Sequence, residues 1–287
     1  MLRSLFAGIS GLRVNQVALD VTGNNIANAN TVGFKSSSVV FSDTLSQMLT
    51  AASSPDPANN RGGSNPIQVG LGVQVAATNT NFNQGFNQST GRGTDLMIEG
   101  DGMFVVEKGR ETVYTRAGAF SWDENGTLVA PGGGRVMGYT TFLASGAADK
   151  SVAPTAITLP ADDGAVPTPH LLKSYDIGPD GKVTATFDDD STAVVGQIAI
   201  ANFTNPMGLE KIGGTSFRAT SNSGAADLGV AGEGSRGELI PGSVEMSNVD
   251  LSAEFTNLIL AQRGFQASSR VITTSDQVLE DLVNIKR

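Results

Sequence analysis

Apolar side chains recur at spacings of three and four residues near both ends of the chain. The N-terminal series is Leu2, Leu5, Ile9, Leu12, Gln16, Leu19, Gly23 and Ile26, and the C-terminal series is Leu251, Phe255, Leu258, Gln262, Phe265, Ser269, Ile272, Asp276, Leu279 and Val283. This spacing places a narrow apolar stripe along one side of a helix, which is typical of a coiled-coil seam. It predicts a helix from about Arg3 to Asn30 and a second helix after Asp250, packed together as a coiled coil.

The residues at the ends of the second helix agree with this prediction. Asp250 is a suitable N-cap, Glu254 lies in the first turn, and Lys286 and Arg287 lie at the end, so each charge suits the helix dipole. A helix that lays its stripe on its own β domain has the same spacing and is the commoner case. We favour pairing of the two helices, because the stripe is narrow and recurs at both ends.

Between these helices the apolar period changes from about 3.6 residues to two, which is the period of a strand. Strands are expected at Val69–Val75, Leu96–Ile98, Met103–Val106, Thr127–Val129, Lys182–Phe187 and Gln197–Phe203, with turns at Asp123–Thr127 and Asp180–Gly181. The expected fold class is therefore α+β, with long terminal helices and a central glycine-rich all-β domain.

Changes in composition predict the domain boundaries. Residues 1–35 form the N-terminal helical half of an inner coiled-coil domain, and residues 247–287 form its C-terminal half. Residues 36–69, rich in Ser, Pro, Asn and Gly toward their end, are expected to be a flexible linker or extended segment. Residues 70–246 form a β-rich outer domain, in which 143–174 are an irregular excursion.

Composition excludes several classes of protein. The 287 residues carry a net charge of −9, so a nucleic-acid binder is not expected, since phosphates are neutralised by clustered Lys and Arg. The chain has no cysteine, which excludes disulfides, thiol nucleophiles and cysteine metal sites. No stretch approaches the ~20 apolar residues that span a bilayer, so membrane insertion is not expected.

The first residues resemble a signal peptide only superficially. Their apolar side chains are spaced helically, Arg13 interrupts them, and no small-residue cleavage site follows. If the protein leaves the cell, we expect it to do so without cleavage of its N-terminus.

The side chains that most often carry catalysis or metal binding are few or badly placed. His170, the only histidine, lies in a proline-rich loop and is expected to be a surface residue. Asp188–Asp190 would alternate in direction on a strand, so we interpret them as a solvated hairpin turn and not as a cation site. Asp95, Glu99 and Asp101 lie among glycines typical of strand ends and tight turns.

Glycine motifs for phosphate binding are also incomplete. Gly70-Leu-Gly72 lacks a third glycine and a following helix, and Gly33–Ser36 lacks the upstream glycine of a phosphate loop. We therefore expect no catalytic, metal or cofactor site, and a protein that is not an enzyme. An extracellular β-rich adhesin or secreted enzyme with helical stalks is the alternative from another class. It would need a conventional export signal and, for an enzyme, a cluster of titratable groups, and the sequence shows neither.

Several segments resemble one known family. Leu19–Lys35 resembles the N-terminal signature of bacterial flagellar rod and hook proteins, and Ser247–Gln266 with Thr273–Leu279 resembles the C-terminal signature. Thr90–Phe104 and Tyr114–Phe120 are also similar to that family. The resemblance covers most of the chain. The residues that match the N-terminal motif are Asn24, Asn25, Ala27, Asn28, Gly33, Phe34 and Lys35.

Within this family the local motifs resemble hook proteins more than distal rod proteins. Gly23–Asn28 is similar to hook subunits, where rod proteins more often have Ser before the Asn pair, and Val249–Ser252, Ala261–Gln266 and Leu282–Arg287 are also similar to hook proteins. Many hook proteins carry a large outermost domain, and only Phe142–Ser174 could occupy its place. The prediction is therefore a short hook protein, with the distal rod protein as the alternative.

The resemblance implies a helical homopolymer whose terminal helices line a channel, with the β domain outside. A hook would be a curved universal joint outside the cell, and a distal rod would be a stiff drive shaft in the basal body. Implied partners are the distal rod protein, the hook cap, the hook–filament junction proteins and the flagellar type III export apparatus. The assembly residues are predicted to be Leu5, Ile9, Leu12, Leu19, Ile26, Leu251, Phe255, Leu258, Phe265, Ile272, Leu279 and Val283.

Two further expectations follow for a polymer of this kind. An isolated subunit would expose the apolar stripes of both terminal helices to water. The termini are therefore predicted to be largely disordered in the monomer and to fold on assembly. The segment from Thr50 to Pro66 is predicted to absorb subunit shifts, because Gly- and Ser-rich chain is soft.

Overall fold

The computed structural model describes residues 2–55, 62–143, 148–161 and 171–285. The chain forms two compact units. The helical unit comprises Met1–Ala27, Ser37–Thr80 and Asp250–Arg287, and the β unit comprises Asn28–Ser36 and Asn81–Val249. Each unit is therefore assembled from segments far apart in the sequence.

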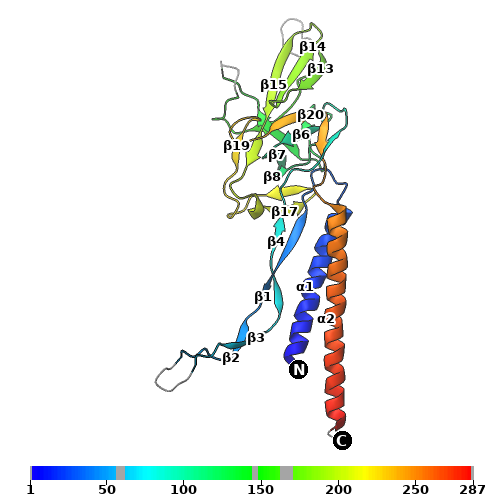
Figure 1. The fold of residues 1–287 in the computed structure, drawn as a ribbon. Helices are drawn as coiled ribbons and strands as arrows, with labels where there is room; N and C mark the ends of the chain where they lie inside the picture. The colour runs from blue at the N-terminus through cyan, green and yellow to red at the C-terminus, as the bar shows by residue number, and fades with distance from the viewer. Residues whose placement is uncertain (1, 56–61, 144–147, 162–170, 286–287) are drawn as a thin grey trace. The chain divides into compact units, whose positions relative to one another are not determined.

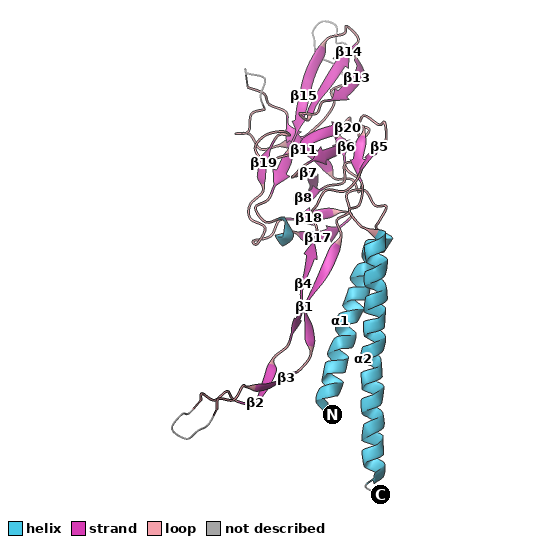
Figure 2. Ribbon diagram, in the orientation of Figure 1, coloured by secondary structure: helices cyan, strands magenta, loops and turns pink. Residues whose placement is uncertain are grey.

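Two helices dominate the helical unit (Figures 1 and 2). Helix α1 (Leu2–Ala27) ends before the expected Asn30, because Asn28 starts a turn in which Thr31 N–H donates to the Asn28 carbonyl at 3.1 Å. Helix α2 (Leu251–Ile285) begins as predicted, since Asp250 Oδ1 accepts hydrogen bonds from the N–H groups of Ser252 (2.8 Å) and Ala253 (3.3 Å). The α+β class is confirmed.

A long β-hairpin completes the helical unit. Strand β1 (Ser37–Asp43) pairs antiparallel with β4 (Val73–Thr80), and β2 (Ser46–Thr50) pairs antiparallel with β3 (Ile67–Gly70). Of the two alternatives expected for residues 36–69, a flexible linker or an extended segment, the described part is extended, and its strands are paired in a hairpin. Apolar and β-branched residues flank its Ser- and Pro-rich portion on both sides, and they pair across it.

The β unit is built on one large antiparallel sheet. Its main path is β13 (Leu172–Ile177), β14 (Lys182–Phe187), β15 (Thr192–Ile198), β11 (Arg135–Tyr139), β7 (Met103–Lys108), β8 (Glu111–Thr115), β18 (Ser216–Arg218) and β17 (Glu210–Gly213). Off this path lie β9 (Ser121–Trp122), β10 (Leu128–Val129), β12 (Thr155–Ala156), β16 (Ile200–Asn202) and β19 (Asp227–Gly229). The strand expected over Gln197–Phe203 is split between β15 and β16 at Ala199.

Two shorter strand pairs and a single turn of 3-10 helix complete the unit. Strand β20 (Glu238–Pro241) pairs with β6 (Leu96–Glu99), and β21 (Ser243–Glu245) pairs with β5 (Asn87–Ser89). The 3-10 turn is Pro206–Gly208.

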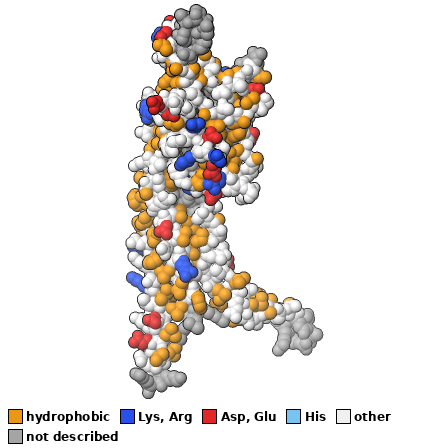
Figure 3. All heavy atoms as spheres, turned by 180° about the vertical axis from the view of Figure 1, so that it is seen from behind, with side chains coloured by type: hydrophobic (Ala, Val, Ile, Leu, Met, Phe, Trp, Pro, Cys, Tyr) orange, Lys and Arg blue, Asp and Glu red, His pale blue; other side chains and the backbone are white. Residues whose placement is uncertain are grey.

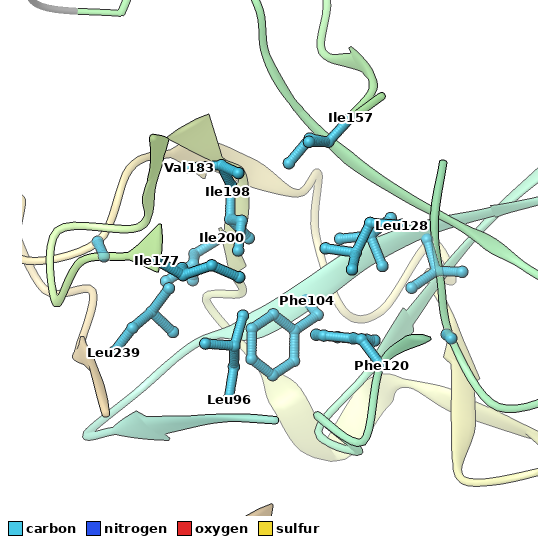
Figure 4. Packing of buried hydrophobic residues seen from close by; sticks show 14 of the residues in the cluster. Leu96, Phe104, Phe120, Leu128, Ile157, Ile177, Val183, Ile198, Ile200 and Leu239 are labelled. Carbon is cyan, nitrogen blue, oxygen red and sulfur yellow. The ribbon is translucent and has the colours of Figure 1, made fainter. Parts of the chain in front are cut away.

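The central sheet is buried on both faces. Along β7, Phe104 and Val106 join one apolar cluster, whereas Met103 and Val105 join a second. Figure 4 shows the first cluster, in which the rings of Phe104 and Phe120 meet edge to face at 4.9 Å. Burial on both sides explains why the first four residues of β7, Met103–Val106, are apolar without alternation.

The predicted domain boundaries differ from the observed units. Residues 28–36 belong to the β unit, whereas 37–80 belong to the helical unit. The described part of the excursion over 143–174 is not irregular throughout. It contains β12 and the start of β13, and Ile157 and Leu159 lie in the core. Apolar residues spaced by two in this stretch pack under the sheet despite the many Pro, Ala and Asp residues around them.

Candidate assembly surface and junction

Helices α1 and α2 lie side by side and antiparallel, and small side chains form their contact. Ser4 Oγ and Ser275 Oγ are 3.2 Å apart. A Cβ atom on Gly8 would lie 3.0 Å from Ile272 Cγ1, and one on Gly264 would lie 2.5 Å from Asn15 Oδ1. The two backbones therefore approach closely, and glycine at these positions permits the approach.

The predicted seam coincides only partly with this contact. Leu5, Leu12, Leu19 and Ile26 on α1 and Leu258, Ile272 and Leu279 on α2 are half-buried. Exposed members of the predicted set are Ile9, Leu251, Phe255, Phe265 and Val283. Large apolar side chains thus fill only part of the contact between the helices, and glycines such as Gly8 and Gly264 lie where the two helices approach closely. Whether the same set makes contacts between subunits stays a prediction.

Both helices therefore present large apolar side chains to solvent. The exposed set includes Phe6, Ile9, Phe255, Ile259, Leu260, Phe265, Val271, Val278, Leu282, Val283 and Ile285. Hydrophobic side chains also spread over the hairpin (Figure 3), and Leu45 there is 83% exposed. A pair of helices has no interior in which these side chains could be buried. An exposed apolar surface of this extent is typical of a protein–protein interface.

Asn25 holds α1, α2 and β1 together inside the helical unit. Its side-chain amide donates to the Ser37 carbonyl at 2.7 Å and to Glu254 Oε1 at 3.0 Å. Its Oδ1 accepts the Ser37 N–H at 3.0 Å. This matched motif residue is buried, and it satisfies polar groups of three elements at once.

A buried cluster of three charges lies in the β unit. Lys35 Nζ is 2.6 Å from Glu245 Oε1, and Arg116 Nε is 2.8 Å from Glu245 Oε2. Lys35 and Glu245 are each about 1% exposed in their side chains. Lys35 also donates to the Asn83 carbonyl at 2.7 Å, and Gly85 N–H donates to Glu245 Oε1 at 2.8 Å. One carboxylate thus joins three segments of the chain.

Burial lowers the pKa of the Lys35 ammonium from its ordinary value, and the Glu245 carboxylate opposes that shift. The remaining donors of Arg116 reach the carbonyls of Gly100 and Gly102. Each member of the cluster is therefore compensated by the others, and removal of the central carboxylate would leave two cations facing each other.

Other motif residues support the same region. Gly33 N–H donates to the Glu245 carbonyl at 2.8 Å, and Lys211 Nζ lies 5.1 Å from the centre of the Phe34 ring. Asn248 Oδ1 accepts the Ser36 N–H at 2.9 Å. Within the β unit, the segments that continue in sequence into α1, β1 and α2 are thus fastened together. We call this set, Gly33–Ser36, Arg116 and Glu245–Asn248, the junction.

Sequence reasoning selected three of the nine junction residues. It selected Gly33, Phe34 and Lys35, and it missed Glu245, Arg116 and Asn248 as their partners. Glu245 could have been found as the single acidic residue between Val244 and Met246 on a strand. A buried carboxylate is almost always paired, so such a residue indicates a cationic partner. Of the other motif residues, Asn28 accepts a hydrogen bond from Thr31, whereas Asn24 and Ala27 are exposed.

We expect Gly33→Ala to destabilise the β unit more than Gly109→Ala, which replaces a glycine of similar backbone conformation. Gly33 has φ +68°, and its Cβ would lie 2.4 Å from Ala117 N. Gly109 has φ +70° but no neighbour within 4 Å, so Gly109→Ala tests backbone strain alone. Urea unfolding should show a loss of about 1 kcal/mol for Gly109→Ala and of about 2 kcal/mol or more for Gly33→Ala. Equal losses would contradict a tight Gly33–Ala117 contact.

The side chains considered as candidates for catalysis or metal binding do not lie together. His170 is outside the described residues. Asp188–Asp190 form the turn between β14 and β15, as predicted, with Lys173 Nζ 2.7 Å from Asp190. Asp95 accepts a hydrogen bond from Thr90 Oγ1 at 2.6 Å. Within the described ranges no His, Cys, Asp and Glu residues gather into a group that could hold a metal ion. Neither described helix is long and apolar enough to cross a membrane.

Three family models match the chain. Residues 5–35 match the flagella basal body rod protein model, residues 97–185 match the flagellar hook protein FlgE/F/G D1 domain, and residues 240–285 match the flagellar basal body rod FlgEFG protein C-terminal model. The flagellar basal-body rod protein FlgG of Bacillus subtilis is 44% identical over 288 positions, with all of both chains covered. The chain belongs to the flagellar rod and hook protein family.

Rod and hook relatives differ in the length over which they align. The rod protein FlgG of Borreliella burgdorferi is 35% identical over 291 positions, with all of both chains covered. The hook protein FlgE of the same organism is 29% identical over 446 positions, again with both chains covered in full, so it is far longer than these 287 residues. Members of the rod and hook family form helical polymers within the flagellum, and this family is structural.

Proposed function

We propose that this chain is the subunit of the distal rod, a straight, stiff tube in the flagellar basal body, and that it has no enzymatic role. The observation that carries the proposal is the 44% identity to a rod protein along the full length of both chains. The hook assignment favoured by the local motifs has weaker support, because the hook relatives contain a large additional region that this chain lacks.

The hairpin supports a stiff tube. Ser10 Oγ on α1 accepts the Val73 N–H at 3.3 Å, and Asn25 bonds to Ser37 at the other end of the same strand pair. These two attachment points are 15 residues apart on α1, about 22 Å along the helix axis. The strand pair β1–β4 is therefore a brace on the helix.

In the polymer, the two helices would pack against helices of neighbouring copies as a coiled-coil layer that lines the channel. The exposed apolar side chains of α1, α2 and the hairpin would become buried on assembly. Burial contributes about 25 cal/mol per Å² of apolar surface, so a few hundred Å² per subunit is enough to drive association. The predicted seam residues that are exposed in the single chain, such as Phe255 and Phe265, would serve between subunits.

The hook is a second candidate, because a hook protein matches the whole chain at 29% identity. Electron microscopy of basal bodies from cells that lack this gene separates the two. A distal rod subunit predicts rods that stop short and carry no hook. Complete rods without a hook would favour the hook, and normal flagella would exclude both.

A further inference from the structure

Helix α2 extends past the end of its partner helix. The helices are antiparallel, and Ser4 lies opposite Ser275, so Leu2 is level with Gln277, two residues further along each helix. Helix α2 continues to Ile285, which leaves eight residues, Val278–Ile285, beyond the described start of α1. Figure 1 shows this extension at the C-terminal end of α2. It is about 12 Å long at 1.5 Å per residue, and we call it the overhang.

The overhang carries an apolar face with an acid at its edge. Val278, Leu282 and Ile285 follow one another at spacings of four and three, so they share one side of the helix. Leu282 is 48% exposed and Ile285 is 80% exposed. Asp281 lies next to this face, three residues after Val278, and the described residues offer it no cationic partner within ion-pair distance.

A groove of matching character lies on α1. It has a volume of about 430 Å³ and lies between Phe6, Ile9, Arg13 and Val17 on one side and Leu71, Val73 and Val75 on the other. From Phe6 to Val17 the groove follows α1 for 11 residues, about 16 Å, which is long enough for the overhang. Arg13 is exposed at the groove, and no described carboxylate lies within ion-pair distance of it.

The groove of a chain cannot receive the overhang of the same chain. Ile9 is level with Arg270, given the Ser4–Ser275 register, and Leu282 lies 12 residues further along α2. That separation is about 18 Å along the helix axis. The natural occupant is therefore a second copy, since the chain belongs to a family of polymers and supplies both an apolar groove with a cation and an apolar ridge with an anion.

We propose that the overhang of one subunit docks into the α1 groove of a second copy, with Asp281 against Arg13 and Leu282 against Ile9. This inference rests on the proposed function as a polymer subunit. Groove and overhang are different surfaces, so each copy uses one of each, and the contact repeats head to tail without closing a dimer.

The absence of cysteine makes cross-linking a clean test. In cells whose only copy is Ile9→Cys/Leu282→Cys, mild oxidation should produce dimers, trimers and longer ladders on non-reducing gels. A disulfide needs Cα atoms within about 7 Å, so the pair cannot close within one folded chain. The control is Ile9→Cys/Ile259→Cys, which places an equally exposed α2 residue far from the overhang and should give no ladder.

Flagella that assemble without a ladder, a ladder equal to that of the control, or dimers alone would overturn the docking contact and leave the proposed function intact. Charge reversal covers the case in which the cysteine pair prevents assembly. Arg13→Asp and Asp281→Arg should each reduce polymer recovery by about 5-fold or more, and the double variant should restore it. No restoration in the double variant would also overturn the proposal.

Discussion

We expect Glu245→Gln to cost about 3–5 kcal/mol of the stability of the β unit, which is the range for breaking a buried ion pair on one side. Glu245 is the single anion between Lys35 and Arg116, at 2.6 Å and 2.8 Å. Without its charge, two buried cations face each other, and burial alone already lowers the pKa of Lys35. Since a domain is stable by only about 5–15 kcal/mol, urea unfolding should show a large shift of the midpoint.

The matched control is Glu111→Gln in the same unit. Glu111 pairs with Arg218 at 2.7 Å, but both side chains are exposed, so the expected loss is below about 1 kcal/mol. The loss of stability for Lys35→Met should lie between the losses for Glu245→Gln and Glu111→Gln, because Lys35→Met leaves Glu245 paired with Arg116. A loss for Glu245→Gln no greater than for Glu111→Gln would contradict the view that the junction depends on this carboxylate.

We expect Gly8→Leu to prevent close packing of α1 on α2 and to abolish most of the polymer. Even a Cβ atom at Gly8 would lie 3.0 Å from Ile272 Cγ1 and 3.5 Å from the Ser268 carbonyl oxygen. Overpacking typically costs about 1–3 kcal/mol, which corresponds to roughly 5- to 150-fold in an association constant. Basal bodies recovered from cells with this variant as the only copy should be correspondingly few.

Gly23→Leu on the same helix is the control. Gly23 has no neighbour within 4 Å, so this change adds the same side chain and the same gain in helix propensity without a clash. Recovery of basal bodies should stay close to the parent level. If both variants lose assembly equally, close approach of the helices at Gly8 is not what the polymer requires.

The two helices and some of the strands were predictable from the sequence, because their signals are local. Periods of 3.6 and two located α1, α2 and, in the large sheet, β7, β10, β14 and the region of β15 and β16, and the Asp250 cap was read from residue type alone. The face on which the helices pair was not predictable, since apolar periodicity marks the stripe that avoids water most strongly. In the single chain, part of that apolar stripe stays exposed, whereas Gly8, Gly264 and Ser275 lie in the contact between α1 and α2.

Long-range pairing accounts for the other differences. Lys35 and Glu245 are 210 residues apart, and the local sequence around each residue does not identify the other as its ion-pair partner. The segment was interpreted as a flexible linker or extended segment, because Ser and Pro near the hairpin tip outweighed Phe41 and Val75, which pair across the hairpin although they are 34 positions apart. The preference for a hook arose similarly from short motifs such as Gly23–Asn28, whereas the full-length comparison with rod proteins favours the rod.

Cryo-electron microscopy of basal bodies from cells with this chain as the only copy would show whether the chain forms the distal rod. We expect repeated subunits in the straight distal part of the rod, with side-chain density for this sequence and with α1 and α2 against the helices of neighbouring copies. Density for this chain in the curved hook, or rod subunits whose helices touch no neighbour, would contradict this expectation.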